Sequence, residues 1–280
     1  ESLMSNQEQV YPHAPRYVEE KSNAKAEHMP YIPTPDPVRF PEAEWQLRID
    51  LAAAYRLIAL LNMDDVIFTH ISMRIPGEVP TFLINPYGMM FEEVTASSLV
   101  KIDVHGRKIC GSDWPVNPAG FDIHAAVHMG GKDAHCVMHT HSLAGMTVAS
   151  MPEGLLPLNQ MSLHFYKRIG RYSYDTIHFP ESEQRRLVAA LGSHRALIME
   201  SHGLLTCGPT AAEAFFYMYY LEKACRIQSQ VLARGDNYLR IPEHVCEEGA
   251  RLFEARPEQK RFMWASFVRK LHRESPSFAA

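Results

Sequence analysis

The spacing of hydrophobic residues along the chain divides it into predicted helices and strands. Between residues 45 and 61, apolar side chains recur every three or four positions, which is the spacing of one face of an α-helix. Pro41 and Glu42 suit the first turn of this helix. Residues 66–74 and 81–85 are rich in β-branched and aromatic side chains, so they predict two strands of a hairpin.

Three further helices are predicted from the residues that flank them. Asn117 starts one that ends at Gly130, and residues 183–191 form another that ends before a glycine. Thr210 opens a long helix toward Leu232. Apolar residues cover most of the circumference of this last helix. That pattern indicates burial on more than one side, against either a neighbouring subunit or an ordinary core.

Two short apolar runs, residues 134–139 and 195–200, predict buried strands that lead to histidines. If the first strand continues through His141, the two-residue period puts His139 and His141 on one face. His202 follows the second run. Three neutral imidazoles can hold Zn, Fe, Mn or Co and leave coordination positions open, as catalytic metal sites do. The alternative is a pair of hydrogen-bonded histidines at a strand end.

Two more histidines, His124 and His128, are one helical turn apart, a spacing that can hold a metal ion on one face of a helix. The helix that carries them is amphipathic, and no third ligand is near them in the sequence. A structural role is therefore favoured for both.

Composition narrows the class of partner. The 280 residues are 46% hydrophobic, which suffices for the core of one large domain or two small ones. The formal net charge is −4, with acidic and basic residues interspersed. Because there is no polybasic patch, neither nucleic acid nor a membrane surface is an expected partner. We expect a small-molecule substrate instead.

Cysteine usage and the absence of targeting signals suggest the compartment. The five cysteines include no Cys-x-x-Cys pair, so we expect reduced thiols. No apolar run is long enough to span a bilayer, and the N-terminal residues lack the apolar core of a secretion signal. We therefore expect a cytoplasmic protein. Residues 1–41 carry prolines among charged residues, which predicts an extended arm.

Several motifs accompany the three histidines. His139-Thr140-His141 continues into Ser-Leu-Ala-Gly-Met, and Ser201-His202-Gly203-Leu204-Leu205 precedes the Thr-Ala-Ala-Glu helix start. Asn85-Pro86-Tyr87-Gly88 occurs earlier in the chain. From about residue 42 to residue 228, the sequence with these motifs resembles the class II aldolase/adducin family.

The resemblance implies a fold, a domain division and a metal. The fold is an α/β/α sandwich, in which a central, mainly antiparallel β-sheet lies between helical layers. The domain covers residues 42–235. The helical patterning of the chain beyond it, and not the resemblance, predicts that residues 236–280 form a C-terminal helical extension packed on the same domain. His139, His141 and His202 are the implied ligands of a divalent metal ion, with zinc expected first and iron, manganese or cobalt as alternatives. A homo-oligomer, specifically a tetramer, is implied as well.

The chain departs from the sugar-phosphate branch of the family at two places. That branch carries a Ser-Ser-Glu element whose Glu is the catalytic acid/base, and a Gly-Asn element that helps to hold phosphate. Here the first element falls on Pro118-Ala119-Gly120 and the second on Thr69-His70. A phosphorylated sugar is therefore not the expected substrate.

Other side chains must then supply the acid/base chemistry. His70 occupies the place of the phosphate-binding Asn, and an imidazole titrates in the useful range. Tyr87 lies in a turn that aligns with a substrate-binding turn of the family. His164 and Tyr166 belong to the region from which the family takes a tyrosine across a subunit interface. Each of these side chains could instead have a purely structural role.

The expected activity is that of a metal-dependent lyase. Its substrate would be a small unphosphorylated carbonyl compound or a 2-oxo or hydroxy acid, and its reaction aldol cleavage or decarboxylation. Decarboxylation needs only a proton donor once carbon dioxide has left, which suits a site without the family's Glu. One alternative is a non-haem Fe(II) oxygenase or decarboxylase of aromatic acid metabolism. Another is an adducin-like binding protein without enzymatic activity.

Overall fold

A computed structural model describes residues 40–280, except residues 78, 111, 177, 178 and 236. The arm predicted for residues 1–41 lies outside the described residues, apart from its last two positions. Eight strands of the described residues form one sheet, in the order β4-β3-β2-β1-β5-β8-β7-β6. All neighbours are antiparallel except β6 and β7. The strands are β1 His70–Ile75, β2 Thr81–Ile84, β3 Val100–Asp103, β4 Lys108–Cys110, β5 Cys136–Thr140, β6 Gly170–Tyr172, β7 Ala196–Met199 and β8 Gly203–Gly208.

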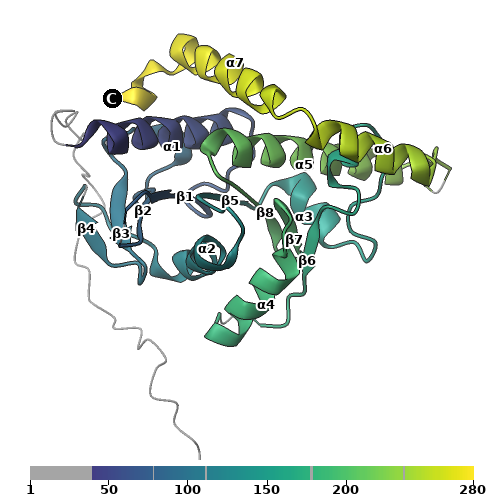
Figure 1. Ribbon diagram of the computed structural model, residues 1–280, viewed down its shortest axis with the longest axis horizontal. Helices are drawn as coiled ribbons and strands as arrows, with labels where there is room; N and C mark the ends of the chain where they lie inside the picture. The colour runs from purple at the N-terminus through teal and green to yellow at the C-terminus, as the bar shows by residue number, and fades with distance from the viewer. Residues whose placement is uncertain (1–39, 78, 111, 177–178, 236) are drawn as a thin grey trace, which may run out of the picture. The chain divides into compact units, whose positions relative to one another are not determined.

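Helices cover both faces of this sheet (Figure 1). α1 and α5 lie on one face, and α2 and α4 lie on the other. The predicted sandwich with a mainly antiparallel sheet is therefore confirmed. None of the described helices is both long and apolar enough to cross a bilayer. The helices are α1 Glu42–Leu60, α2 Pro118–Gly130, α3 Leu143–Ala149, α4 Glu181–Leu191, α5 Ala211–Leu232, α6 Glu243–Glu254 and α7 Glu258–Glu274, with short 3₁₀ helices η2 Phe91–Glu93, η3 Ser162–Phe165 and η4 Pro276–Ala279.

Local sequence signals set several helix ends. α1 begins directly after Pro41, and α2 has Pro118 at its first position. The Thr210 hydroxyl accepts a hydrogen bond from the Glu213 backbone N–H at 3.2 Å, which caps α5. α4 ends at Leu191 and is capped by Gly192, which has a φ of 56°. The helices predicted from these signals are therefore present.

The first predicted strand is shorter than its sequence pattern. β-branched and aromatic residues extend from residue 66, yet β1 begins only at His70. Val66 and Thr69 have positive φ angles of 54° and 65°, so the chain turns there instead of extending.

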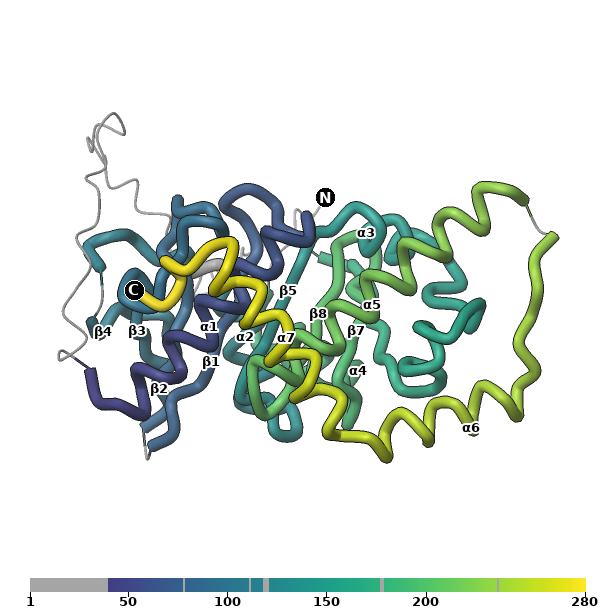
Figure 2. Tube along the Cα trace, turned by 90° about the horizontal axis from the view of Figure 1, so that it is seen from above, coloured from purple at the N-terminus to yellow at the C-terminus, as the bar shows by residue number. Residues whose placement is uncertain are grey.

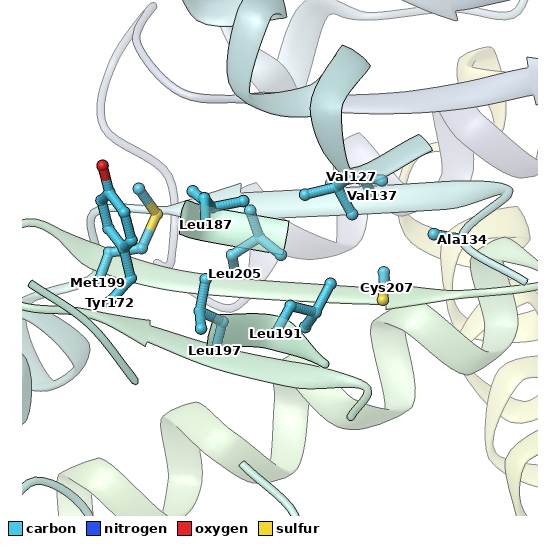
Figure 3. Close-up of a cluster of buried hydrophobic side chains, with 10 residues drawn as sticks. All are labelled: Val127, Ala134, Val137, Tyr172, Leu187, Leu191, Leu197, Met199, Leu205 and Cys207. Atoms are coloured by element: carbon cyan, nitrogen blue, oxygen red, sulfur yellow. The ribbon is translucent and has the colours of Figure 1, made fainter. Parts of the chain in front are cut away.

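A cluster of buried apolar side chains joins the sheet to the helices on one face (Figure 3). Val137 of β5 and Leu205 of β8 meet Val127 of α2 and Leu187 of α4 there. Full burial of such a side chain stabilises the fold by about 1.5–3 kcal/mol. Because side chains alternate between the faces of a strand, His139 lies on the same face as Val137. The cluster thus fixes the strand that carries His139.

α7 crosses over the first part of α5 (Figure 2). Phe215 of α5 is fully buried, and its ring centroid lies 5.8 Å from that of Trp264 and 5.2 Å from that of Phe267. The apolar circumference noted in the sequence therefore includes a second packed face within the chain. α6 packs separately, against η3.

Four strand ends meet at one edge of the sheet, where the histidines lie. β1 starts where β5 ends, because His70 pairs with His139. β8 starts beside the end of β5, where Leu204 pairs with Thr140, and β7 ends where Met199 pairs with Gly203. Side chains next to these strand ends are therefore brought together from distant parts of the sequence.

Candidate metal centre

His139, His141 and His202 come together at this edge of the sheet. One ring nitrogen of each lies within 4.8 Å of those of the other two. His139 is in β5, His141 follows it directly, and His202 ends the turn between β7 and β8. The ring centroids are 4.8–5.0 Å apart. The three histidines singled out in the sequence thus form one cluster.

Hydrogen bonds turn two of these rings so that Nε2 faces the middle of the cluster. His139 Nδ1 donates to the Leu204 carbonyl oxygen at 2.9 Å, and His141 Nδ1 donates to Asp65 Oδ2 at 2.9 Å. When both rings are neutral, each has one N–H, and both Nε2 atoms, 3.0 Å apart, then carry lone pairs. Tetrahedral zinc with bonds of about 2.0–2.1 Å holds its nitrogens about 3.3 Å apart. This donor set therefore fits a divalent metal ion.

Burial keeps the imidazoles of His139 and His202 in the form that binds metal. Desolvation, with His202 and His141 close by, holds the pKa of His139 well below its usual value. Desolvation and His141 also lower the pKa of His202 to about 4. Both rings are consequently neutral at pH 7, and a metal ion would not have to displace a proton from them.

Gly203 lets β8 approach the histidines closely. A Cβ atom at this position would lie 2.4 Å from the Thr140 carbonyl oxygen. It would also lie 3.2 Å from the His141 ring and 3.3 Å from the His139 ring. A side chain at this position would therefore displace either β5 or the rings.

A buried carboxylate holds the turn that follows His141. Ser142 donates its hydroxyl to Glu222 of α5, and the Gly145 backbone also hydrogen-bonds to Glu222. Only 4% of Glu222 is exposed, and this burial raises its pKa. Glu222 thereby ties the start of α3 to α5, and with it the position of His141.

Two of the predicted acid/base residues lie at the same edge of the sheet as the cluster. His70 is 7% exposed and directly opposite His139 in the β1–β5 pair. Desolvation, with His141 second, lowers the pKa of His70 to about 4. Tyr87 is half-buried in the turn after β2, whose end lies beside the start of β1, and its backbone N–H bonds to the Pro115 carbonyl.

The other two candidates, His164 and Tyr166, lead into the opposite end of the sheet. They precede β6, which runs parallel to β7, whereas His202 follows β7. His164 stacks on Phe253 with a centroid distance of 4.0 Å, and Tyr166 donates to Glu243. His164 lines a cavity of about 420 Å³ with cationic side chains that include Arg168. Within one chain, these two residues are therefore remote from the histidine cluster.

Sequence reasoning missed two residues that contact the cluster. Asp65 accepts the hydrogen bond from His141, and the Tyr174 ring centroid lies 5.6 Å from that of His202. Asp65 forms an acidic pair with Asp64 just ahead of the first strand, which was a usable signal. Tyr174 follows β6 and reaches the cluster only through the pairing of β6 with β7. No local pattern marks it.

Comparisons with known proteins agree with this architecture. The family model described as "Class II Aldolase and Adducin N-terminal domain" matches residues 49–229. The "Putative aldolase class 2 protein" of Caulobacter vibrioides is 48% identical over 240 residues, which cover 85% of this chain and 93% of that protein. Rat alpha-adducin is 37% identical over 201 residues, 71% of this chain but 27% of the adducin.

A solved structure extends the comparison to three dimensions. The L-fuculose 1-phosphate aldolase from Glaciozyma antarctica superimposes with a TM-score of 0.74 and 29% sequence identity. The match covers 89% of this chain and 96% of that one. With the family model spanning more than half of the sequence, the chain belongs to the class II aldolase/adducin family.

Proposed function

We propose that the protein is a divalent-metal-dependent lyase that acts on a small unphosphorylated carbonyl compound or a 2-oxo or hydroxy acid, by aldol cleavage or decarboxylation. The observation that carries this proposal is the convergence of ring nitrogens from His139, His141 and His202. A divalent ion held there, zinc in the first instance, would supply Lewis-acid polarisation of a substrate oxygen. The likeness to an L-fuculose 1-phosphate aldolase supports the reaction class.

The residues around the cluster favour a substrate without phosphate. His70 takes the place of an amide that helps the sugar-phosphate branch to hold phosphate. Because burial keeps its pKa near 4, the ring is neutral at pH 7 and offers no positive charge to an anion. The acid/base Glu of that branch is replaced within Pro118-Ala119-Gly120. Both changes weigh against a sugar phosphate.

The chain's own groups would handle the protons of the reaction. His70, neutral and next to His139, can accept a proton or hold a substrate hydroxyl. Tyr87 approaches from the neighbouring strand end and has a hydroxyl to donate. Asp65 keeps His141 in one tautomer, with Nε2 directed at the ligand position.

His164 and Tyr166 would act across a subunit boundary. They lie at the opposite end of β6 from the cluster of the same chain, so they can approach such a cluster only in another copy. We therefore propose a homo-oligomer, and a tetramer as its size. Native mass spectrometry measures the number of chains, and a strictly monomeric protein would remove both residues from the proposed site.

The test of the metal site is elemental analysis of protein purified without oxygen, chelator or nickel resin. About one Zn, Mn or Co ion per chain in the wild type, lost in His139→Ala, is the expected result. His135→Ala is the matched control, because His135 is exposed just ahead of β5 and should keep the metal. A wild-type protein that holds no divalent ion after reconstitution contradicts the proposal.

Turnover is then measured with a panel of 2-oxo and hydroxy acids, by release of carbon dioxide or of an aldehyde. The expected activity depends on the added metal and is absent in His139→Ala. Iron together with oxygen uptake would instead favour the oxygenase alternative.

A second candidate function is an adducin-like binding role, which the 37% identity to rat alpha-adducin favours. In that case the histidine cluster only braces the fold. His139→Ala would lower the free energy of unfolding, and no metal-dependent turnover would exist to be lost. Both quantities are measured on the same pair of proteins.

A further inference from the structure

A line of buried polar side chains runs from the metal centre into the protein between the sheet and α2. Ser72 Oγ lies 2.7 Å from His124 Nδ1 and 2.7 Å from His128 Nε2. His128 Nδ1 lies 2.7 Å from the Ala134 carbonyl oxygen. Ser72 and His124 are fully buried, and 3% of His128 is exposed. We call these three side chains the relay.

The relay starts beside His70. Along β1, His70 and Ser72 share one face of the sheet, and they pair with His139 and Val137 of β5. The ring centroids of His70 and His124 are 5.5 Å apart. The polar line therefore continues from the metal-centre edge through His70 to His124.

The chemistry of the last acceptor fixes the direction of every hydrogen bond in the relay. A carbonyl oxygen only accepts, so His128 carries its proton on Nδ1 and leaves Nε2 as an acceptor. Ser72 then donates its one hydroxyl proton to His128 Nε2. The remaining contact of Ser72 must be a hydrogen bond that it accepts from His124 Nδ1–H. Burial lowers the pKa values of His124 and His128, which keeps both rings neutral.

His124 is thereby left with a bare Nε2 lone pair that faces no donor. This atom is buried and is among the side-chain atoms of the described residues that lack a hydrogen-bond partner. A buried acceptor without a donor is destabilising, so such an atom in a native protein calls for a partner.

His70 is the side chain placed to provide that partner. An imidazole nitrogen lies about 1.1 Å from its ring centre, so an N–H···N bond of about 2.9 Å sets two centroids about 5 Å apart. The observed 5.5 Å is within about half an ångström of that separation. The Thr69 backbone is the competing acceptor for the His70 ring. A carbonyl oxygen has two lone pairs, so it can lose one donor and still accept another hydrogen bond. The His124 Nε2 atom has a single lone pair and has no such reserve.

We propose that His124 is a positioning residue: the relay presents its Nε2 lone pair to His70, and the hydrogen bond from His70 holds that ring beside the metal centre. The inference rests on the proposed function for the role of His70, but the hydrogen bonds themselves do not depend on turnover. With its N–H directed at His124, His70 presents its other nitrogen, a lone pair, toward the metal-centre edge. Such a nitrogen suits a hydroxyl or a water as hydrogen-bond donor, and not an anion.

The direct test is nuclear magnetic resonance of protein labelled with ¹⁵N-histidine, with and without Zn²⁺. We expect His124 and His128 to be protonated on Nδ1 and bare on Nε2. We also expect a ¹⁵N–¹⁵N coupling across the hydrogen bond from His70 to His124. His124 protonated on Nε2, or His70 bonded to Thr69 without that coupling, would overturn the proposal.

Three variants separate positioning from packing. Ser72→Ala removes the acceptor for His124 Nδ1–H, so the His124 tautomer and the coupling to His70 should both be lost. His124→Gln should keep the hydrogen bond from His70, because the Gln amide nitrogen can donate to Ser72 while its oxygen accepts from His70. His124→Ala should lose that hydrogen bond. Ser98→Ala is the control, since Ser98 is also buried but, among the described residues, hydrogen-bonds within the turn at Thr95 and not to the relay.

Kinetics complete the test where a substrate turns over. Ser72→Ala and His124→Ala should lower kcat about tenfold or more with KM changed less than about twofold, and His124→Gln should recover most of the loss. Unchanged kcat in His124→Ala would overturn the positioning role. If no substrate turns over but the tautomers and the coupling are as expected, the proposed function fails while the hydrogen-bonded relay stands.

Discussion

Asp65 and the Leu204 carbonyl each orient one histidine of the cluster. Each accepts the Nδ1–H of a cluster residue, and so each directs the Nε2 lone pair of that ring inward. The carboxylate differs because it is a side chain and can be replaced without moving the backbone. It also carries a negative charge, which a carbonyl does not, and that charge favours a cation bound at the other ring nitrogen.

Replacing Asp65 with Asn should therefore weaken metal binding without removing a ligand. We expect the affinity for Zn²⁺ to fall about 10- to 100-fold, the usual effect of losing such a partner. Competition against a chromophoric chelator measures it. Asp64→Asn is the matched control, because Asp64 adjoins Asp65 in the chain and, in the described structure, makes no hydrogen bond to the three histidines. Equal affinities in the two variants would contradict the role of Asp65.

Gly203 allows a second prediction at the residue scale. Gly203→Ala would place a Cβ atom 2.4 Å from the Thr140 carbonyl, so the β5–β8 pair must shift at the histidines. We expect a loss of about 2–4 kcal/mol in the free energy of unfolding, together with weaker metal binding. Urea denaturation and metal titration measure the two effects. Gly77→Ala, where a Cβ would meet nothing within 4 Å, should change neither.

At the scale of elements, the long helices could be predicted, whereas the short α3 and much of the sheet could not. Helix ends depend on neighbours in sequence, as the Thr210 cap and Pro41 illustrate. β4 and β6 have three residues each, too few to show a period, and β8 is buried along its whole length, so it has no alternation to read. Their pairing depends on contacts across the chain, which a local pattern does not encode.

The candidate site likewise contains residues that could be predicted from the sequence and residues that could not. The three histidines lie in two short motifs, so sequence alone could name them and place His139 and His141 together. Asp65, Tyr174 and the partners of Ser72 reach the site through strand pairing and helix docking. Their roles required the fold.

The packing of α7 on α5 gives a prediction at the scale of elements. Phe267→Ala removes an aromatic ring that contacts Phe215, so the free energy of unfolding should fall by about 2 kcal/mol, less than for a fully buried Phe. Urea denaturation monitored by circular dichroism measures the change. Phe262→Ala, on the same helix but 70% exposed, should cost far less. Similar losses of unfolding free energy in both variants would mean that the contact of Phe267 with Phe215 does not stabilise the fold more than an exposed side chain on α7 does.

At the scale of the whole molecule, the buried histidines tie stability to pH. Burial lowers the pKa of His70 and His202 to about 4 and that of His128 to about 3, and those of His124 and His139 fall as well. In the unfolded chain a histidine has a pKa of about 6.5. Between these values the unfolded state binds more protons than the folded state, so stability is greatest above pH 6.5 and falls as the pH drops toward 4.

We expect the free energy of unfolding of the metal-free protein to fall steeply between pH 6.5 and 4, each buried histidine adding up to about 1.4 kcal/mol per pH unit. Urea denaturation at a series of pH values measures the slope. His128→Gln keeps a donor and an acceptor in the relay but removes one titrating ring, so its slope should be shallower. His105→Gln removes an exposed histidine and should leave the slope unchanged. A flat profile in the wild type would mean that these rings become protonated without unfolding the protein.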